Sequence, residues 1–289
     1  MMKKVIIGTV AASIILSGCS QLDPYLEKIP FLSNADHNGS DTTEQNEQPS
    51  QNEEDNHETN EESETASNTM EEENDMSLEA AYFNDIKVVD ELNIIQNPSN
   101  IMALVNKQFS LPSDYAPDDL VRPDVAFSFG DEEVEKSYLR KEAAEGLEKM
   151  FAAAKKDGID LFAVSGYRSY ERQDAVFSAE VNRVGEEKAV QAVAFPGSSE
   201  HQTGLSMDIS SATVDYTLTE KFENAPEGKW LKDNAHHYGF ILRYPKGKEE
   251  VTGYQFEPWH FRYIGVDAAT VIFEKDLTLE EYFDAVKKI

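Results

Sequence analysis

The chain of 289 residues contains a long acidic tract that limits which part of it can fold. From Asn34 to Met76 the sequence has 15 acidic residues, no Lys or Arg, and almost no apolar side chains. Such a segment buries too little apolar surface to balance the conformational entropy lost on folding. We therefore predict a disordered linker over residues 34–77. The folded core must come from residues 78–289, which are numerous enough for one well-buried domain.

The remaining residues alternate between helical and strand-like patterns. Apolar residues recur at three- and four-residue steps before Asp157-Gly158, which predicts a helix that ends there. The predicted helices cover residues 138–156, 170–184 and 186–194, and the predicted strands cover residues 161–165, 205–210, 239–244 and 259–264. This mixture predicts an α+β fold with a small antiparallel sheet and helices on one side. Residues 78–105 fit either a helix or a pair of strands.

Two short segments hold side chains that bind metals and transfer protons. The first reads Ser199-Glu-His201-Gln-Thr-Gly204-Leu-Ser-Met-Asp208, and the second reads Glu257-Pro-Trp-His260. Two histidines and one carboxylate suit Zn²⁺, and three protein ligands leave a fourth position for water. Glu257 lies three residues before a histidine and is then available as the general base. The two segments together predict a mononuclear zinc hydrolase site on the sheet.

The local patterns around these segments indicate how they are built. Leu205, Met207 and Ile209 alternate with polar residues, so a strand would bury these three and present Asp208 on its other face. Strict alternation would place Glu257 and His260 on opposite faces of a strand. We therefore predict a turn or bulge near Pro258 that lets both residues reach one metal.

A third segment, Ser165-Gly-Tyr-Arg168-Ser169, follows a predicted strand and precedes a helix that Ser169 could cap. The planar guanidinium of Arg168 suits a terminal carboxylate or the oxyanion of a tetrahedral intermediate, whereas a surface salt bridge is the alternative role. In the helix, Phe177, Val181 and Val184 are predicted to form the buried stripe. Gln173, one turn into this helix, could reach a substrate or face solvent.

These motifs resemble the VanY-type D-alanyl-D-alanine carboxypeptidases and their LdcB-type L,D-carboxypeptidase relatives. The stretch from Leu104 to Val121 resembles the entry segment of the same family, so the similarity covers about residues 100–275. The resemblance implies a zinc peptidase that removes the terminal D-alanine from peptidoglycan stem peptides. It assigns the following roles: His201, Asp208 and His260 as zinc ligands, Glu257 as catalytic base, Arg168 as a substrate or transition-state contact, and Ser199 and Gln173 as substrate-binding residues.

The N-terminus indicates where this chemistry takes place. A short basic start, an apolar run from Val5 to Leu16 and the sequence Leu16-Ser-Gly-Cys19 are typical of an export signal and resemble a bacterial lipobox. We predict a signal peptide over residues 1–18, a lipid on Cys19, and an anchor and juxtamembrane segment over residues 19–33. Two acyl chains on one residue suffice for stable anchoring. The enzyme is thus expected outside the cytoplasm, attached to the cell membrane.

The sequence leaves several functions open. We expect a D-Ala-D-Ala carboxypeptidase domain over residues 78–289, acting as a monomer on stem peptides. The alternatives are an L,D-carboxypeptidase acting on tetrapeptide stems, a D-Ala-D-Ala dipeptidase, and a non-catalytic peptidoglycan-binding module. Loss of the base would indicate the binding module, but Glu257 is present. No basic stripe exists that would bind nucleic acid, and the sole cysteine excludes a disulfide within the chain.

Overall fold

Four antiparallel strands form the central sheet of the computed structural model, which describes residues 76–289. The strands are β7 (Phe162–Ser165), β8 (Ser206–Ser210), β9 (Phe240–Leu242) and β10 (His260–Tyr263), in the order β7-β8-β10-β9. All four were predicted: β7 and β8 with a start one residue too early, and β9 and β10 with both ends one or two residues further out. The predictions for the signal peptide, Cys19 and nearly all of the acidic linker lie outside the described residues.

The strand register brings the two metal-binding segments side by side. His260 of β10 lies opposite Asp208 of β8. On the other side of β8, the register shifts between Ala163 and Ser165, so that Ser165 lies opposite Asp208 as well. A shift of this kind is a β-bulge, which re-aims the side chains next to it. Asp208 is therefore the centre of a row that crosses three strands.

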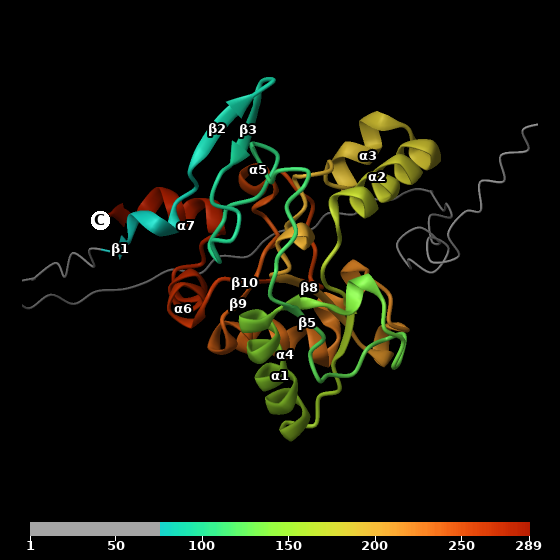
Figure 1. Cartoon of the computed structure of the whole chain (residues 1–289). Helices are drawn as coiled ribbons and strands as arrows, with labels where there is room; N and C mark the ends of the chain where they lie inside the picture. The colour runs from blue at the N-terminus through green and yellow to red at the C-terminus, as the bar shows by residue number, and fades with distance from the viewer. Residues whose placement is uncertain (1–75) are drawn as a thin grey trace, which may run out of the picture.

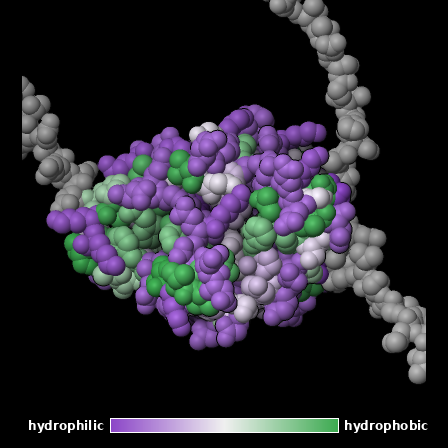
Figure 2. Space-filling model, turned by 90° about the horizontal axis from the view of Figure 1, so that it is seen from above, coloured by the Kyte–Doolittle hydropathy of each residue, from purple (hydrophilic) through white to green (hydrophobic). Residues whose placement is uncertain are grey.

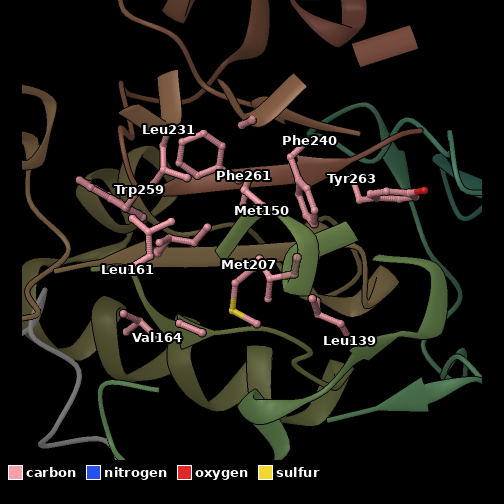
Figure 3. Close-up of a cluster of buried hydrophobic side chains, with 14 of the residues drawn as sticks. Leu139, Met150, Leu161, Val164, Met207, Leu231, Phe240, Trp259, Phe261 and Tyr263 are labelled. Carbon is pink, nitrogen blue, oxygen red and sulfur yellow. The ribbon is translucent and has the colours of Figure 1, made fainter. Parts of the chain in front are cut away.

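One face of the sheet packs against α1 (Lys141–Lys156) and α4 (Pro226–Asn234) (Figure 1). The core between them contains residues from all four strands and both helices, some of which Figure 3 shows: Ala143, Leu147, Met150, Ala163, Met207, Leu231, Phe240 and Phe261. Helix α1 starts three residues later than predicted. Leu139–Arg140 form the short strand β6 instead, which pairs with β5 (Leu120–Val121).

A helical hairpin, α2 (Tyr170–Val184) and α3 (Glu186–Ala192), lies on the other side of the sheet (Figure 1). Ser169 caps α2 as predicted, because its hydroxyl accepts a hydrogen bond from the Arg172 amide at 3.2 Å. The prediction of helices on one side is therefore right for α1 and α4 only. The α2–α3 hairpin borders the opposite face, where Gln173 and Val176 of α2 line the same cavity as Asp208 and His260.

Residues 76–111 form short strands and one 3₁₀ turn, and no α-helix. β2 (Ile86–Val89) and β3 (Leu92–Ile95) make a hairpin, and β4 (Phe109–Ser110) pairs with β3 in parallel. β1 (Ser77–Leu78) pairs with β11 (Lys287–Lys288), so the first and last described strands are neighbours. A second buried cluster connects this region to α6 (Val266–Glu274) and α7 (Leu279–Ala285); its buried members include Met102, Ile241, Ile264, Ile272 and Leu279.

The remaining elements are short. One turn of α-helix, α5, covers Glu249–Thr252. The 3₁₀ helices of residues 76–289 are η3 (Ala80–Tyr82), η4 (Glu135–Ser137), η5 (Glu200–Thr203), η6 (Ala212–Val214), η7 (Glu220–Asn224) and η8 (Ala235–Tyr238). Hydrophilic side chains dominate the face seen in Figure 2, and hydrophobic ones form small separate patches. Among residues 76–289, no helix is both long and apolar enough to cross a bilayer.

Candidate metal centre and active site

Asp208 and His260 meet on the face of the sheet that is opposite to α1. Met207 and Ile209, the neighbours of Asp208, are fully buried in the core, so the predicted alternation of β8 is confirmed. The carboxylate Oδ1 of Asp208 lies 3.1 Å from Nδ1 of His260. Both residues are buried, with 4% and 3% of their surface exposed. The site is therefore largely shielded from solvent.

His201 reaches Asp208 from the 3₁₀ helix η5, which directly precedes β8. Gly204 ends this helix with a left-handed backbone (φ 65°), and this conformation lets the chain turn into the strand. Nδ1 of His201 lies 2.8 Å from the carbonyl oxygen of Gly166, and Nε2 lies 3.4 Å from Oδ2 of Asp208. Because a carbonyl only accepts, the Gly166 contact makes Nδ1 the protonated nitrogen and leaves Nε2 free.

Glu257 enters the site through a turn at Pro258 and Trp259. The amide of His260 donates to the carbonyl oxygen of Glu257 at 3.2 Å, which closes this turn before β10 begins. The predicted irregularity near Pro258 is therefore confirmed. As a result, Oε2 of Glu257 lies 3.8 Å from Nδ1 of His260, and the Glu257 side chain keeps 23% of its surface exposed. A carboxylate in this position can contact both the metal centre and solvent.

The three predicted ligands fit a zinc ion. One ligand atom from each of His201, Asp208 and His260 lies within 4.8 Å of the other two. Ligands at zinc distances of about 2.0–2.1 Å would lie about 3.3 Å apart in a tetrahedron, and the observed contacts are 3.1 and 3.4 Å. The second nitrogen of each imidazole contacts an oxygen of another residue, Gly166 for His201 and Glu200 for His260. Such contacts are usual for metal-binding histidines.

The charges of the site suit a bound cation. Burial lowers the pKa of His201 to about 3, so this imidazole is neutral and can ligate. Burial also lowers the pKa of His260, but hydrogen bonds to Asp208 and Glu200 outweigh it and raise the pKa to about 9. For Asp208, burial opposes ionisation, but the two histidines and Arg168 lower its pKa overall. The site thus stabilises positive charge where the ligand atoms converge, and Nδ1 of His260 releases its proton when a cation binds.

Burial raises the pKa of Glu257 to about 7 and outweighs the opposing effects of His260 and Arg168. A carboxyl group with a pKa near neutrality can accept a proton in one step and return it in the next. The geometry and protonation of Glu257 therefore suit a general base. Its position beside the ligand set is the arrangement that the sequence motif indicated.

Arg168, Gln173 and Ser199 line the same cavity as the metal-binding set and Glu257. Nη1 of Arg168 donates to Oε1 of Gln173 at 2.8 Å, and Nε2 of Gln173 donates to the carbonyl oxygen of Ala194 at 2.7 Å. Gln173 is buried, so the solvent-facing alternative is wrong. Its amide orients Arg168 toward the cavity. The Ser199 hydroxyl forms no hydrogen bond with residues 76–289 and is free to contact a ligand.

The motifs did not single out Glu200, although it lies between Ser199 and His201. Its side chain is fully buried and contacts His260, Arg243 and Arg262. The sequence gives one indirect sign. Arg262 shares a face of β10 with His260, and a buried guanidinium requires a carboxylate partner. Tyr244 was also not predicted. Its ring lies 4.9 Å from the ring of His260, and it lines the cavity.

Comparisons with known proteins agree with this site. Residues 136–266 match the family model described as VanY, D-alanyl-D-alanine carboxypeptidase. A protein of Bacillus subtilis (strain 168) named as a putative carboxypeptidase, YodJ, is 61% identical to this chain over 223 residues. The match covers 77% of this chain and 81% of YodJ. The solved structure of the LdcB LD-carboxypeptidase has a TM-score of 0.72 and 62% identity; it covers 74% of this chain and 100% of LdcB.

A more distant structure connects the family to a metal. The vancomycin resistance D,D-pentapeptidase VanY, solved in complex with Zn(II), is 34% identical with a TM-score of 0.50, over 63% of this chain and 97% of its own. The resemblance that the sequence motifs indicated is thereby confirmed. The protein is a carboxypeptidase that acts on peptidoglycan peptides, and it belongs to the VanY family, which also includes its LdcB-type relatives.

Proposed function

We propose that this protein is a zinc L,D-carboxypeptidase that removes the terminal D-alanine from tetrapeptide stems of peptidoglycan. The observation that carries this preference is its similarity to the LdcB LD-carboxypeptidase, with 62% identity over the whole of that chain. The D,D-pentapeptidase VanY is only 34% identical. The D,D activity expected from the sequence is the second candidate, favoured by the D-alanyl-D-alanine description of the family.

In this proposal Nε2 of His201, a carboxylate oxygen of Asp208 and Nδ1 of His260 hold the zinc. Zinc, when bound, supplies Lewis-acid activation of water and of the scissile carbonyl group. Glu257 takes a proton from the attacking water and passes it to the nitrogen of D-alanine as the carbon–nitrogen bond breaks. A pKa near 7 supports both transfers, because neither protonation state of Glu257 is strongly favoured.

Arg168 is proposed to bind the terminal carboxylate of the stem peptide or the developing oxyanion. Gln173 and Ser165 accept hydrogen bonds from its two terminal nitrogens at 2.8 and 3.3 Å, which fixes the plane of the guanidinium. A fixed, planar fork can form two parallel hydrogen bonds with a carboxylate. The Ser199 hydroxyl, which lines the same cavity, is proposed as a further substrate contact.

Replacing Arg168 with Lys is expected to lower kcat/KM on the preferred stem peptide by about 100-fold, because an ammonium keeps the charge but loses the fork. Zinc content should stay at the wild-type level. Steady-state kinetics with paired metal analysis would measure both. Arg183→Lys is the matched control, since Arg183 forms an ion pair with Glu180 near the end of α2 and does not line the cavity. An equal loss of activity in both variants would contradict the proposed role of Arg168.

Mass spectrometry of defined stem peptides tests the proposed function. Purified protein from residue 77 onward would be incubated with a tetrapeptide stem and with a pentapeptide stem, with and without a chelator. We expect chelator-sensitive loss of one alanine from the tetrapeptide. Loss from the pentapeptide alone would replace the L,D proposal with the D,D candidate. No change in either stem, despite bound zinc, would reject carboxypeptidase activity on these stems.

The lipid anchor is also a proposal. The basic start, apolar run and Leu16-Ser-Gly-Cys19 sequence support lipidation of Cys19 and attachment to the outer face of the cell membrane. Intact-mass analysis of the protein extracted from bacterial membranes should give a chain that begins at Cys19 and carries a lipid adduct. A mature chain with an unmodified Cys19 would contradict the anchor.

A further inference from the structure

A buried carboxylate lies directly behind the candidate metal centre. Oε1 of Glu200 accepts hydrogen bonds from Nε of Arg243 at 2.7 Å and from Nη1 of Arg262 at 2.8 Å. Its other oxygen, Oε2, lies 3.3 Å from Nε2 of His260 and accepts a hydrogen bond from Ser206 Oγ at 3.2 Å. Both oxygens of Glu200 therefore have partners, and one of these partners is a candidate metal ligand.

The two arginines fix this carboxylate without reaching the metal centre. Arg262 donates to the carbonyl oxygens of Ile101 and Ala103 at 3.0 and 2.9 Å. Arg243 forms two hydrogen bonds with Glu280 of α7, at 2.8 and 2.7 Å. Both guanidinium groups are fully buried. Their other contacts hold them in place, so the Glu200 carboxylate has little freedom to rotate.

Stability alone does not account for this network. Removing several charges from water is unfavourable, and apolar residues of similar volume often give an equally stable or more stable core. The network nevertheless places one carboxylate oxygen against the imidazole of His260. A hydrogen bond from the outer nitrogen of a metal-binding histidine fixes the orientation of the ring and makes the inner nitrogen a better ligand.

We propose that Glu200 is a positioning residue that directs Nε2–H of His260 away from the metal and thereby makes Nδ1 the metal-binding atom. This inference rests on the proposed role of His260 as a zinc ligand. His201 is oriented in the opposite sense, because its Nδ1 contacts the carbonyl oxygen of Gly166 and its Nε2 faces Asp208. The two histidines thus bind through different nitrogens, and only His260 relies on a side-chain carboxylate.

The variant Glu200→Gln tests this role, and Glu280→Gln is its matched control. Both changes remove one negative charge from a contact of Arg243, but Glu280 accepts from Arg243 and Asn106 and not from His260. We expect Glu200→Gln to weaken zinc binding 10- to 100-fold. Glu280→Gln should bind zinc as the wild type does. Competition with a chromophoric chelator measures the affinities, and thermal unfolding of the metal-free proteins measures stability separately.

Equal zinc affinities in the wild type and Glu200→Gln would overturn this inference and leave the proposed function intact. Equal weakening in both variants would also overturn it, since the network would then act on the fold as a whole. A wild-type protein without zinc affinity would reject the proposed function together with this inference. These results therefore distinguish failure of the positioning role of Glu200 from failure of the proposed function.

A second measurement does not depend on correct folding of Glu200→Gln. In the zinc-loaded wild type labelled with ¹⁵N, two-bond proton–nitrogen spectra report which imidazole nitrogen carries the proton. We expect one metal-bound histidine with a protonated Nε2, His260, and one with a protonated Nδ1, His201. Assignment follows from the signal set that shifts in Tyr244→Phe, because the ring of Tyr244 lies 4.9 Å from the ring of His260. A protonated Nδ1 on both histidines would overturn the inference.

Discussion

Replacing Glu257 with Gln is expected to lower kcat on the preferred stem peptide by about 10³- to 10⁴-fold, the upper part of the range for general acid–base catalysis. The large effect follows from the two transfers assigned to this side chain, since Gln can neither take the proton from water nor return it to the leaving nitrogen. Glu257 is not one of the three converging ligands. Zinc content should therefore remain close to one ion per chain.

The measurement is kcat with metal content determined on the same sample. Glu250→Gln is a suitable control, because Glu250 is an exposed glutamate on α5, seven residues away in the sequence. It should turn over at the wild-type rate. If Glu257→Gln kept more than about a tenth of the wild-type rate with full zinc content, the assignment of the base would be wrong. Loss of both zinc and activity would instead show that Glu257 supports the metal.

The sequence predicted the central sheet because each of its strands has a local pattern. In β8 and β10, apolar residues alternate with the residues that form the site, so one pattern gives both the strand and the face that carries Asp208 and His260. The turn at Pro258 was predictable for a geometric reason. Glu257 and His260 can serve one site only if the strand is interrupted between them.

The buried stripe of α2 was predicted wrongly. The buried residues of the helix are Gln173, Val176 and Glu180. The residues of the predicted stripe, Phe177, Val181 and Val184, are only half-buried. Phe177 packs on Phe195 with ring centroids 4.6 Å apart. Helical spacing identifies apolar stripes, but this helix buries two polar side chains. Gln173 lies in the site, and Glu180 forms an ion pair with Arg183. Local patterns do not distinguish a polar residue that orients an arginine from one that faces water.

Contacts that are distant in sequence were equally hard to predict. Glu200 is separated from Arg243 and Arg262 by 43 and 62 residues, and their association depends on the pairing of strands. The hairpin of β2 and β3 was hard to predict because its turn lacks the usual turn residues. Its two turn residues, Asp90 and Glu91, have positive φ angles of 47° and 68°, which are typical of Asn-Gly rather than of this pair. The sequence left that region open between a helix and strands.

Replacing His201 with Ala is expected to abolish stoichiometric zinc binding and, with it, turnover. The loss of affinity should exceed the 10- to 100-fold typical of residues outside the ligand set, and therefore exceed that of Glu200→Gln. Burial holds the pKa of His201 at about 3, so at neutral pH its Nε2 is unprotonated and needs no proton release to bind a cation. Metal analysis after dialysis against buffered zinc, followed by kinetics, would measure both effects.

His237→Ala is the control for this variant, because His237 lies in η8 and is outside the ligand set. It should keep full zinc content and wild-type kinetics. Retained stoichiometric zinc in His201→Ala would contradict the ligand set, whatever the activity. Retained zinc affinity in Glu200→Gln would contradict only the positioning role. Because His201 is oriented by a backbone carbonyl and His260 by a buried carboxylate, the two variants separate the ligand atoms from the residues that orient them.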